Sequence, residues 1–416
     1  MNSSEIDHTQ VDIAISGGSF AGLTLAYALS FSSSHNLQIA VIDPQQIDAP
    51  SDKFDGRAFA VSAGSKQLLE VLGIWSHIAE HAQPVSEIEI TDTALEAVIR
   101  PALLHFNNNL QDESAATHIL ESTWLLNILR EKVGNRDNIR LFSGNHITDF
   151  KNEQSSIHLF LQDKTEVRSR LLVAADGKKS ELRKQAGIKT IGWPYDQMGI
   201  VTTITHSRSH EGKAVQHFLP NGPFAILPLT NNRSSLVWSE KTEIARQLLK
   251  ADDETFLSEL KLRAGRFLGE ISLAGPRGGF PLDLQIAREF IADRFALIGD
   301  AAHGIHPIAG LGLNIGLRDV AALTEVIIKA SRIGVDFGSQ PILQQYSRWR
   351  RFDSTISAFT MDALNRLFSN EITPVKVLRD LGLGLVNRSQ PLKSFFMNEA
   401  AGNSEGAPLL LQGQEI

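Results

Sequence analysis

The sequence predicts an α/β fold in which a parallel sheet, covered by helices, is interrupted by an inserted antiparallel sheet. Three observations support this prediction. Residues 11–30 read as an apolar strand, a glycine turn and an apolar helix, and two similar apolar runs end near residues 176 and 300. Alternating, β-rich runs separated by turn residues fill much of 190–284. Since motifs of the first kind lie on both sides of these runs, we expect the parallel-sheet domain to be discontinuous.

The stretch 11-VDIAISGGSFAGLTLAYALS-30 has the layout of a dinucleotide-binding turn. In that fingerprint the first glycine makes the tight turn, the second lets the backbone approach a pyrophosphate, and the third allows close packing of helix on strand. Gly17 and Gly22 fill the first and third places, while Ser19 stands in the second, beside Gly18. Because serine is small and Gly18 keeps the turn flexible, we interpret this as a tolerated variant.

An acid follows at the expected distance. The run 39-IAVID-43 is an apolar strand that ends in Asp43, about twenty residues after the last glycine of the turn, where an acid holds ribose hydroxyls. A glycine fingerprint alone is weak evidence, but the strand, the helix and the spaced acid together indicate a dinucleotide site.

The segment 171-LLVAADGKKSELRKQAGI-188 is again an apolar strand, followed by Asp176 and Gly177. Gly177 permits a sharp exit from the strand, and Ser180 and Arg183 offer a hydrogen-bond donor and a cation for a phosphate. The alternative is that these two residues only cap and begin a helix.

The segment 295-FALIGDAAHGIHPIAGLGLNIGLRD-319 predicts the place where a flat ligand meets the protein. Residues 295–298 form a short buried strand, so Gly299 and Asp300 should lie at its carboxyl edge. The glycines that follow let the backbone approach a flat, partly anionic ring. A helix beginning between Gly312 and Gly316 would direct its N-terminal N–H groups at negative charge. The alternative is a plain turn between strand and helix.

The inserted region contains 200-IVTTITH-206, 224-FAILPL-229 and 234-SSLVWSE-240, separated by turn residues at 221–223 and 231–232. These runs predict antiparallel strands that lie over the ligand and form walls for a substrate. After Gln340 the chain is expected to be helical through 344–368.

Composition excludes several classes of protein. Lys and Arg number 40 against 47 Asp and Glu, and no long basic run occurs, so we expect no nucleic-acid partner. The absence of cysteine excludes disulfides, thiolate metal sites and a cysteine nucleophile. We also expect no metal site, because His303 and His306 are the nearest approach to a cluster and, with a glycine between them, are expected to face a flat ligand.

The sequence predicts a cytoplasmic protein. The polar, acidic start MNSSEIDHTQ is neither a secretory signal nor a transit peptide, and no apolar stretch reaches the length of a membrane span. The segment 381-LGLGLVNRSQPLKSFFMNE-399 mixes apolar residues with Arg388 and Lys393, which suggests peripheral contact with the inner face of a membrane. The alternative is a C-terminal helix packed on the body of the protein.

These motifs together resemble flavoprotein aromatic hydroxylases, most closely the family that hydroxylates ubiquinone precursors. The sequence motif of that family is His-Pro-x-Ala-Gly-Gln-Gly-x-Asn-x-Gly-x-x-Asp. The residues that match it here are His306, Pro307, Ala309, Gly310, Gly312, Asn314, Gly316 and Asp319. Leu311 departs from it by replacing the glutamine, and Thr123 stands where relatives carry an arginine that meets the pyrophosphate. The resemblance covers most of residues 11–330.

The resemblance implies a fold like that of p-hydroxybenzoate hydroxylase, with a Rossmann-like domain that binds FAD and NAD(P), an inserted antiparallel-sheet substrate domain, and C-terminal helices. The expected FAD-binding domain comprises 10–75, 115–190 and 285–345, and the expected substrate domain 76–114 and 191–284. A C-terminal helical region, 346–400, and a tail, 401–416, complete the division.

The implied reaction uses FAD, NADPH or NADH, and O2 to add one oxygen atom to an aromatic ring through a flavin hydroperoxide. His306 and Pro307 are expected to border the reacting edge of the flavin, and Arg57 to lie against it. His217 is a candidate for contact with the substrate, and the alternative is a structural strand histidine. The residues expected to bind the cofactor are Gly17, Gly18, Ser19, Ala21, Gly22, Asp43, Arg57, Asp176, Gly177, Gly299, Asp300, Gly310, Gly312, Leu313 and Asn314.

The implied substrate is a prenylated phenol on the route to ubiquinone, with contact to a membrane or a biosynthetic complex as a further hypothesis. Two alternatives stay open. One is a hydroxylase of a small soluble aromatic, which a cationic group over the substrate would favour. The other is a non-catalytic FAD-binding partner of a biosynthetic complex, suggested by Ser19, Thr123 and Leu311.

Overall fold

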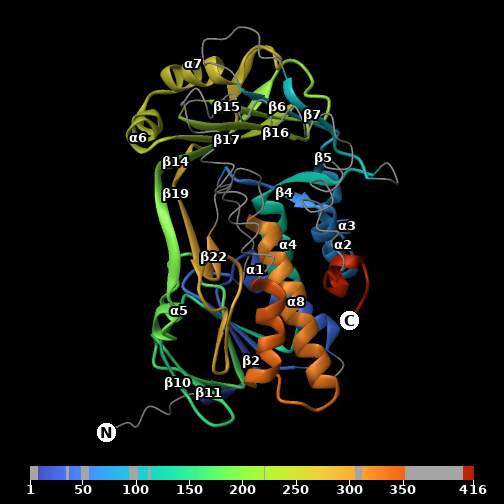
Figure 1. Cartoon of the computed structure of the whole chain (residues 1–416), viewed down its shortest axis with the longest axis vertical. Coiled ribbons are helices and arrows are strands. Elements are labelled where there is room, and N and C mark those ends of the chain that lie inside the picture. The colour runs from blue at the N-terminus through green and yellow to red at the C-terminus, as the bar shows by residue number, and fades with distance from the viewer. Residues whose placement is uncertain are drawn as a thin grey trace.

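The computed structural model describes residues 8–33, 37–47, 56–92, 102–110, 114–219, 221–304, 312–351 and 406–416. It has two lobes (Figure 1): a lower one with a parallel sheet beside long helices, and an upper one with a sheet under two helices that is antiparallel except between β15 and β6. The long strands β14 (Thr190–His206) and β19 (Gly278–Ala287) pair with each other and run from one lobe to the other (Figure 1). The predicted α/β class is confirmed.

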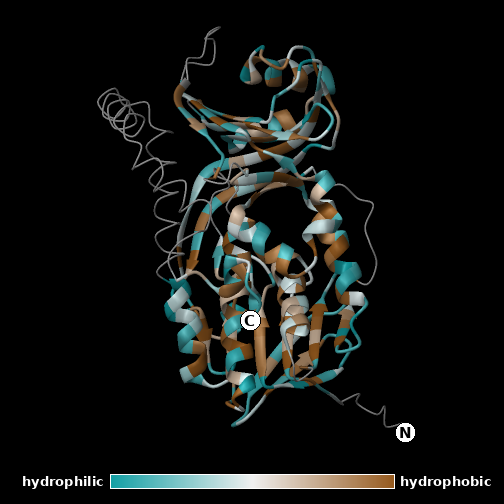
Figure 2. Cartoon of the chain, turned by 90° about the vertical axis from the view of Figure 1, so that its right-hand side faces the viewer, coloured by the Kyte–Doolittle hydropathy of each residue, from teal (hydrophilic) through white to brown (hydrophobic). Residues whose placement is uncertain are grey.

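The lower lobe is built on a six-stranded sheet of order β20-β21-β13-β2-β3-β9, parallel except for its edge strand β20. Helices α1 (Phe20–Ser32) and α8 (Gly312–Arg332) pack on it and on each other. Its strands are apolar and largely buried, because helices cover them (Figure 2). Their bounds are Ile13–Ser16 (β2), Ile39–Asp43 (β3), Ile139–Ser143 (β9), Leu171–Ala174 (β13), Ile291–Ala292 (β20) and Phe295–Leu297 (β21).

The carboxyl ends of the central strands meet at one edge of this sheet. There the Gly17 N–H donates to the Ile42 carbonyl at 2.8 Å, and the Ala175 N–H donates to the Ser16 carbonyl at 2.7 Å. The predicted motifs around residues 17, 43, 176 and 300 therefore emerge side by side, although they are far apart in the chain.

The upper sheet has the order β22-β19-β14-β17-β16-β15-β6-β7, and β18 pairs with β14. The predicted runs around 200, 224 and 234 lie in β14, β16 and β17, which are antiparallel neighbours as expected. Helices α6 (Thr242–Lys250) and α7 (Asp253–Ala264) cover one face of the sheet. The other bounds are Glu87–Asp92 (β6), Ala102–Asn107 (β7), Lys213–Leu219 (β15), Gly222–Leu229 (β16), Arg233–Lys241 (β17), Ile271–Leu273 (β18) and His303–Gly304 (β22).

A three-stranded sheet, β4-β8-β5, lies between the lobes. Its strands are β4 (Ala58–Ser62), β8 (Thr117–Glu121) and β5 (Gln83–Pro84). Glu121, at the end of β8, accepts two hydrogen bonds from the Arg233 guanidinium of β17, at 2.8 and 3.0 Å. Because this pair is bidentate and largely buried, it fixes the upper sheet on the small one.

The remaining elements complete the lower lobe. A four-stranded sheet comprises β1 (His8–Gln10), β12 (Glu166–Ser169), β11 (Ile157–Leu161) and β10 (Ile147–Asn152) in that order. The helical elements are Ala63–Val71 (α2), Trp75–Ile78 (α3), Ala79–His81 (η1), Ser122–Gly134 (α4), Glu181–Gln185 (α5), Gly299–Ala301 (η2) and Leu409–Gln412 (η4).

The C-terminal part is described only in pieces. Residues 340–351 are helical, which agrees with the start of the predicted helix 344–368. At the end of the chain, Leu410 and Leu411 of η4 are buried, and η4 packs on α2 and α8. The predicted membrane-contact segment, 381–399, lies outside the described residues. In the part of the chain that the structure describes, no helix is long and apolar enough to cross a membrane.

Candidate active site

The glycine turn after β2 is closed so tightly that side chains would not fit. Gly17 has φ +116°, and a Cβ built on it would lie 2.2 Å from the Ala175 carbonyl oxygen. A Cβ on Gly22 would lie 1.9 Å from the Gly17 carbonyl oxygen. These two glycines therefore bring α1 against the strand, as the fingerprint requires. Ser19 is exposed at the N-cap of α1, and its side chain makes no capping hydrogen bond.

Asp43 lies beside this turn. Its Oδ2 accepts a hydrogen bond from the Gly18 N–H at 2.6 Å, and its Oδ1 accepts one from the Gln45 N–H at 2.7 Å. A carboxylate has about four acceptor positions, so two contacts to the backbone orient the group without exhausting it. The remaining capacity suits ribose hydroxyls.

The starts of α1 and α8 converge on Gly299. This glycine has φ +57°, a Cβ on it would lie 3.2 Å from the Ala21 Cβ, and a Cβ on Gly316 would lie 3.6 Å from its Cα. Small residues at these three positions let two helix N-termini and the end of β21 approach one another. Their N–H groups and positive dipole ends thus face a common region.

Asp300 is the accessible acid of this region. Protein surrounds it on most sides, and this burial raises the pKa of its carboxyl, while the nearby charges of His303, Lys178 and Arg57 act in the opposite direction. The residue nevertheless keeps an exposed surface. An acid with cations nearby and a surface open to solvent can accept hydrogen bonds from a bound hydroxyl group.

The structure changes the interpretation of the segment after Asp176. Ser180 caps α5 by accepting a hydrogen bond from the Arg183 N–H at 3.0 Å. The buried Arg183 guanidinium donates to the carbonyls of Ala301 at 2.8 Å and Lys178 at 2.9 Å. The expected cation for phosphate is therefore wrong: Arg183 joins two loops, and the capped-helix alternative is right.

Asp176 itself remains open to a ligand. Burial raises the pKa of its carboxyl, and the hydrogen bond from Ser180 and the charge of Arg183 offset only part of this. Its Oδ1 atom is buried and has no hydrogen-bond partner among the described residues. A buried acceptor in this state is usually satisfied by water or by a bound molecule.

The first turn of α8 is fixed on β4. The Asn314 Oδ1 accepts a hydrogen bond from the Ser62 N–H at 2.9 Å, and its Nδ2 donates to the Ala60 carbonyl at 2.7 Å. Because the Asn314 side chain is engaged in this way, a contact of Asn314 with the cofactor would have to come from its backbone, and this role stays a prediction. Leu313 is buried beside it, and Gly312 is exposed. The expected site residues His306, Pro307 and Gly310, and the departure at Leu311, lie outside the described residues.

His217 lies on the face of the upper sheet that α6 and α7 cover. Its Nδ1 is 2.6 Å from the Thr91 Oγ1, and its ring stacks on Phe224 with 6.3 Å between centroids. Phe224 belongs to the apolar cluster under α6 and α7. The placement favours the alternative in which His217 is a structural strand histidine, so we do not retain it as a substrate residue.

A buried charge network beneath Gly299 was not predicted. Asp319 of α8 is 0% exposed. Its carboxylate accepts hydrogen bonds from the Gly299 N–H at 2.8 Å and from the Arg350 Nε at 2.7 Å. The His303 Nε2 also lies 2.8 Å from this carboxylate. Burial alone would raise the pKa of Asp319, but His303 and Arg350 hold it below its usual value. Tyr346 also donates to the Leu297 carbonyl at 2.7 Å. The sequence showed Asp319 as a motif position but gave no signal for its partners.

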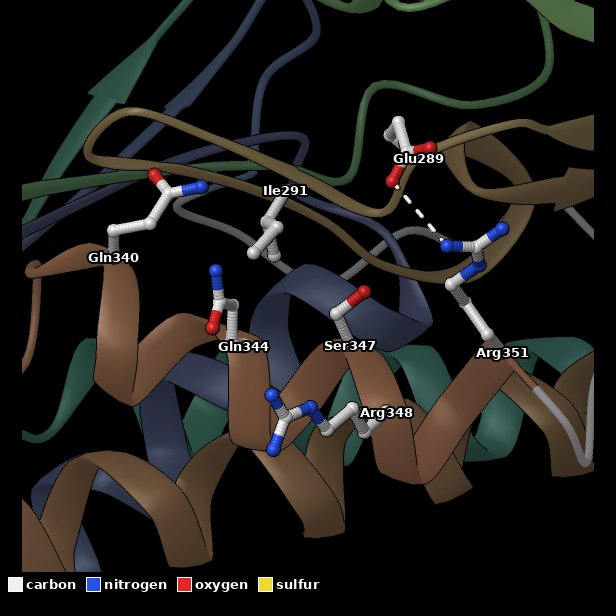
Figure 3. A pocket seen from close by; sticks show the side chains of 7 residues that line it. All are labelled: Glu289, Ile291, Gln340, Gln344, Ser347, Arg348 and Arg351. Carbon is white, nitrogen blue, oxygen red and sulfur yellow. Dashed lines mark hydrogen bonds and ion pairs between the residues drawn. The ribbon is translucent and has the colours of Figure 1, made fainter.

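A pocket of about 430 Å³ lies elsewhere, between β20 and residues 340–351 (Figure 3). The Arg351 guanidinium lies 3.4 Å from Glu289 at its rim. None of the expected site residues lines it, so it is not the candidate active site. Its lining residues are Glu289, Ile291, Gln340, Gln344, Ser347, Arg348 and Arg351.

Comparison with known proteins decides the family. A family model described as FAD binding domain matches residues 10–353. Ubiquinone hydroxylase UbiL of Rhodospirillum rubrum is 39% identical over 400 residues, which cover 95% of this chain and 91% of that protein. The chain belongs to the FAD-dependent hydroxylases of ubiquinone biosynthesis.

Other members of the family are similarly related. Ubiquinone biosynthesis monooxygenase COQ6 of Homo sapiens is 32% identical over 438 residues, covering 94% of this chain and 92% of that protein. The 3-demethoxyubiquinol 3-hydroxylase of Escherichia coli is 31% identical over 395 residues, covering 94% and 98%. The crystal structure of p-nitrophenol 4-monooxygenase PnpA from Pseudomonas putida shares the fold, with a TM-score of 0.79 at 16% identity over 96% of this chain and all of that one.

The residues of the site fit FAD, the family's cofactor. The turn at Gly17 leaves no room for a Cβ, Asp43 keeps acceptor capacity, the Asp176 Oδ1 lacks a partner among the described residues, and Asp300 is accessible. A dinucleotide with two ribose units and a pyrophosphate uses such acceptors and helix N-termini. In the described ranges, no group of three or more His, Asp or Glu side chains is arranged to hold a metal ion.

Replacing Asp300 with alanine is expected to weaken FAD binding by roughly tenfold or more, because a charged hydrogen-bond acceptor is lost from the site. The measurement is the ratio of flavin to protein absorbance in the purified variant, followed by titration with FAD. Asp293→Ala, at an exposed acid in the turn between β20 and β21, is the matched control and should retain its flavin. Full flavin occupancy in Asp300→Ala would contradict the assignment.

Proposed function

We propose that this protein hydroxylates the aromatic ring of a prenylated phenol in ubiquinone biosynthesis, with NADPH or NADH as reductant and O2 as oxygen donor. The observation that carries the proposal is the meeting of four cofactor motifs at one sheet edge, beneath a second sheet with a largely apolar, partly exposed face. The relatives named for ubiquinone biosynthesis supply the substrate class.

Bound FAD would supply the redox chemistry by accepting a hydride and, once reduced, activating dioxygen. The chain's own residues bind and orient it. We assign the pyrophosphate to the turn from Gly17 to Gly22 and the start of α1, ribose hydroxyls to Asp43, and the ribityl side to Asp300. Arg57, which immediately precedes β4, and the start of α8 would meet the ring, and His306 and Pro307 would border its reacting edge.

The upper sheet would hold the substrate over the ring. The face of β15, β16 and β17 turned away from α6 and α7 carries mostly apolar side chains, and two of them, Leu227 and Val237, are only partly buried. An apolar wall of this kind excludes water from the reacting centre and binds a greasy ring. In the proposed division, 76–114 and 191–284 form the substrate domain, and 10–75, 115–190 and 285–345 form the FAD domain.

A prenylated substrate resides in a membrane, so we also propose a cytoplasmic protein that makes peripheral contact with the inner face of the membrane or with a biosynthetic complex. The support is the substrate class, together with the mixture of apolar and basic residues in 381–399.

The test is anaerobic reduction of the purified FAD protein by NADPH, with and without a prenylated phenol, followed by admission of O2 and measurement of the product mass. Gain of one oxygen atom by the phenol supports the proposal. Reduction and reoxidation that yield only hydrogen peroxide would reject this substrate class in favour of another aromatic. A bound flavin that neither NADPH nor NADH reduces would favour a non-catalytic FAD-binding partner.

A further inference from the structure

The two faces of strand β15 have different neighbours, and these identify where each side chain points. Val215 belongs to the apolar cluster under α6 and α7, and His217 lies on the same face. Ala214 belongs instead to a cluster with Ile119 of the small sheet between the lobes. Because side chains alternate along a strand, Gln216 shares the face of Ala214 and points away from α6 and α7.

Gln216 is the polar member of an apolar row across this face. Gln216 pairs with Ala225 of β16. The row continues from Ala225 to Val237 of β17, and from Val237 to Val201 of β14. On its other side Gln216 pairs with Ile90 of β6. An amide between the apolar residues Ala225 and Ile90 is costly to bury unless a partner is supplied.

This row leads to the candidate flavin site. A Cβ on Gly56 would lie 3.8 Å from the Val201 carbonyl oxygen, so the loop that carries Arg57 adjoins the end of the row. Ala58 and Ala60, the next residues of β4, pack with Ala214 in one cluster. The same β4 forms two hydrogen bonds with Asn314 of α8, one donated by the Ser62 N–H and one accepted by the Ala60 carbonyl. Gln216 therefore belongs to the sheet face that is turned toward the cofactor motifs.

The Gln216 amide is available to a ligand. Its side chain is partly exposed, and no hydrogen bond joins it to another residue in the described part of the chain. A glutamine amide carries one acceptor oxygen and two N–H donors, so it can accept from a phenol O–H or donate to the phenol oxygen. Because the amide is neutral, it cannot act as a base. It can only orient the substrate and select among substrates.

We propose that Gln216 is a specificity-determining residue, whose amide hydrogen-bonds the ring oxygen of the phenol and so fixes which ring carbon faces the flavin. This inference rests on the proposed function. A site built around such a hydrogen bond rejects an analogue that lacks the oxygen, because the bound ring then covers the amide and leaves it unpaired. The apolar residues of the row contact the ring itself, so they do not distinguish the phenol from the analogue that lacks the oxygen.

The experiment compares 2-prenylphenol with prenylbenzene, which lacks the hydroxyl, as ligands of the FAD-loaded protein by equilibrium dialysis. Wild-type protein should bind the phenol about tenfold more tightly than the hydrocarbon. Gln216→Met keeps the length of the side chain and removes the amide, so it should weaken phenol binding about tenfold and leave hydrocarbon binding unchanged. Gln247→Met, on the exposed face of α6, is the matched control and should behave as wild type.

FAD affinity of each variant, measured by the change in flavin fluorescence, reports whether the fold and the cofactor site are intact, and it should be unchanged. If Gln216→Met and wild type bind the phenol equally well, the role of Gln216 is overturned, while the proposed substrate class is not. An equal loss for both ligands would also overturn this role, since that result indicates general damage to the wall. Wild-type protein whose flavin is reduced by NADPH but which binds neither compound would instead overturn the proposed substrate class, and this inference with it.

Discussion

Replacing Arg350 with methionine is expected to lower the free energy of unfolding by about 3–5 kcal/mol, because it breaks a buried ion pair and leaves Asp319 with only His303 beside it. Asp319 is completely buried, and the Arg350 Nε lies 2.7 Å from it. Asp319 also holds the N–H of Gly299, the residue before Asp300. Loss of Arg350 should therefore disturb the turn that presents Asp300 and weaken FAD binding as well as stability.

Arg351→Met is the matched control for this prediction. Arg351 lies on the same helix, is exposed, and pairs with the exposed Glu289 at 3.4 Å, so its loss should change stability by less than about 1 kcal/mol. Both variants are compared by urea unfolding of the FAD-free protein and by FAD titration. Similar unfolding free energies for the two variants would show that the Asp319 network does not support the fold.

Local sequence was sufficient to predict the parts of the fold that short segments determine. The turn from Gly17 to Gly22, the strand that ends in Asp43 and the start of α8 at Gly312 each depend on residues close together in the chain. Their meeting at one sheet edge also followed, because parallel strands in an α/β sheet place their carboxyl ends together.

The residues that pair with Asp319 could not be predicted from local sequence. Arg350 follows it by 31 positions and packs against it through a separate helix, so no periodicity in the sequence relates the two. Arg183 shows the same limit, because a cation after a glycine turn fits a phosphate as well as it fits two backbone carbonyls. Only the fold decides between these environments.

The case of His217 has a simpler cause. The segment lies in the inserted sheet as predicted, but a strand has two faces, and the sequence did not fix which one is covered by helices. A shift of one residue, from His217 to Gln216, moves the side chain from the core under α6 and α7 to the opposite face. The neighbours of Val215 and Ala214 supply the missing information.

Replacing Gly22 with alanine is expected to abolish FAD binding and to destabilise the fold by at least about 1–3 kcal/mol, the usual cost of overpacking. The new Cβ would lie 1.9 Å from the Gly17 carbonyl oxygen, and a backbone atom cannot move aside as the end of a side chain can. Either α1 moves away from β2 or the turn at Gly17 changes shape. Both changes displace the helix N-terminus that we assign to the pyrophosphate.

Gly134→Ala separates this steric effect from the general effect of removing a glycine from a helix. Gly134 ends α4, and a Cβ there would meet nothing within 4 Å. Alanine at that position should leave FAD binding unchanged and, through the reduced entropy of the unfolded chain, stabilise the protein by up to about 1 kcal/mol. Both variants are measured by FAD titration and urea unfolding. Unchanged FAD affinity in Gly22→Ala would mean that this turn does not hold the cofactor, and the pyrophosphate would have to be reassigned.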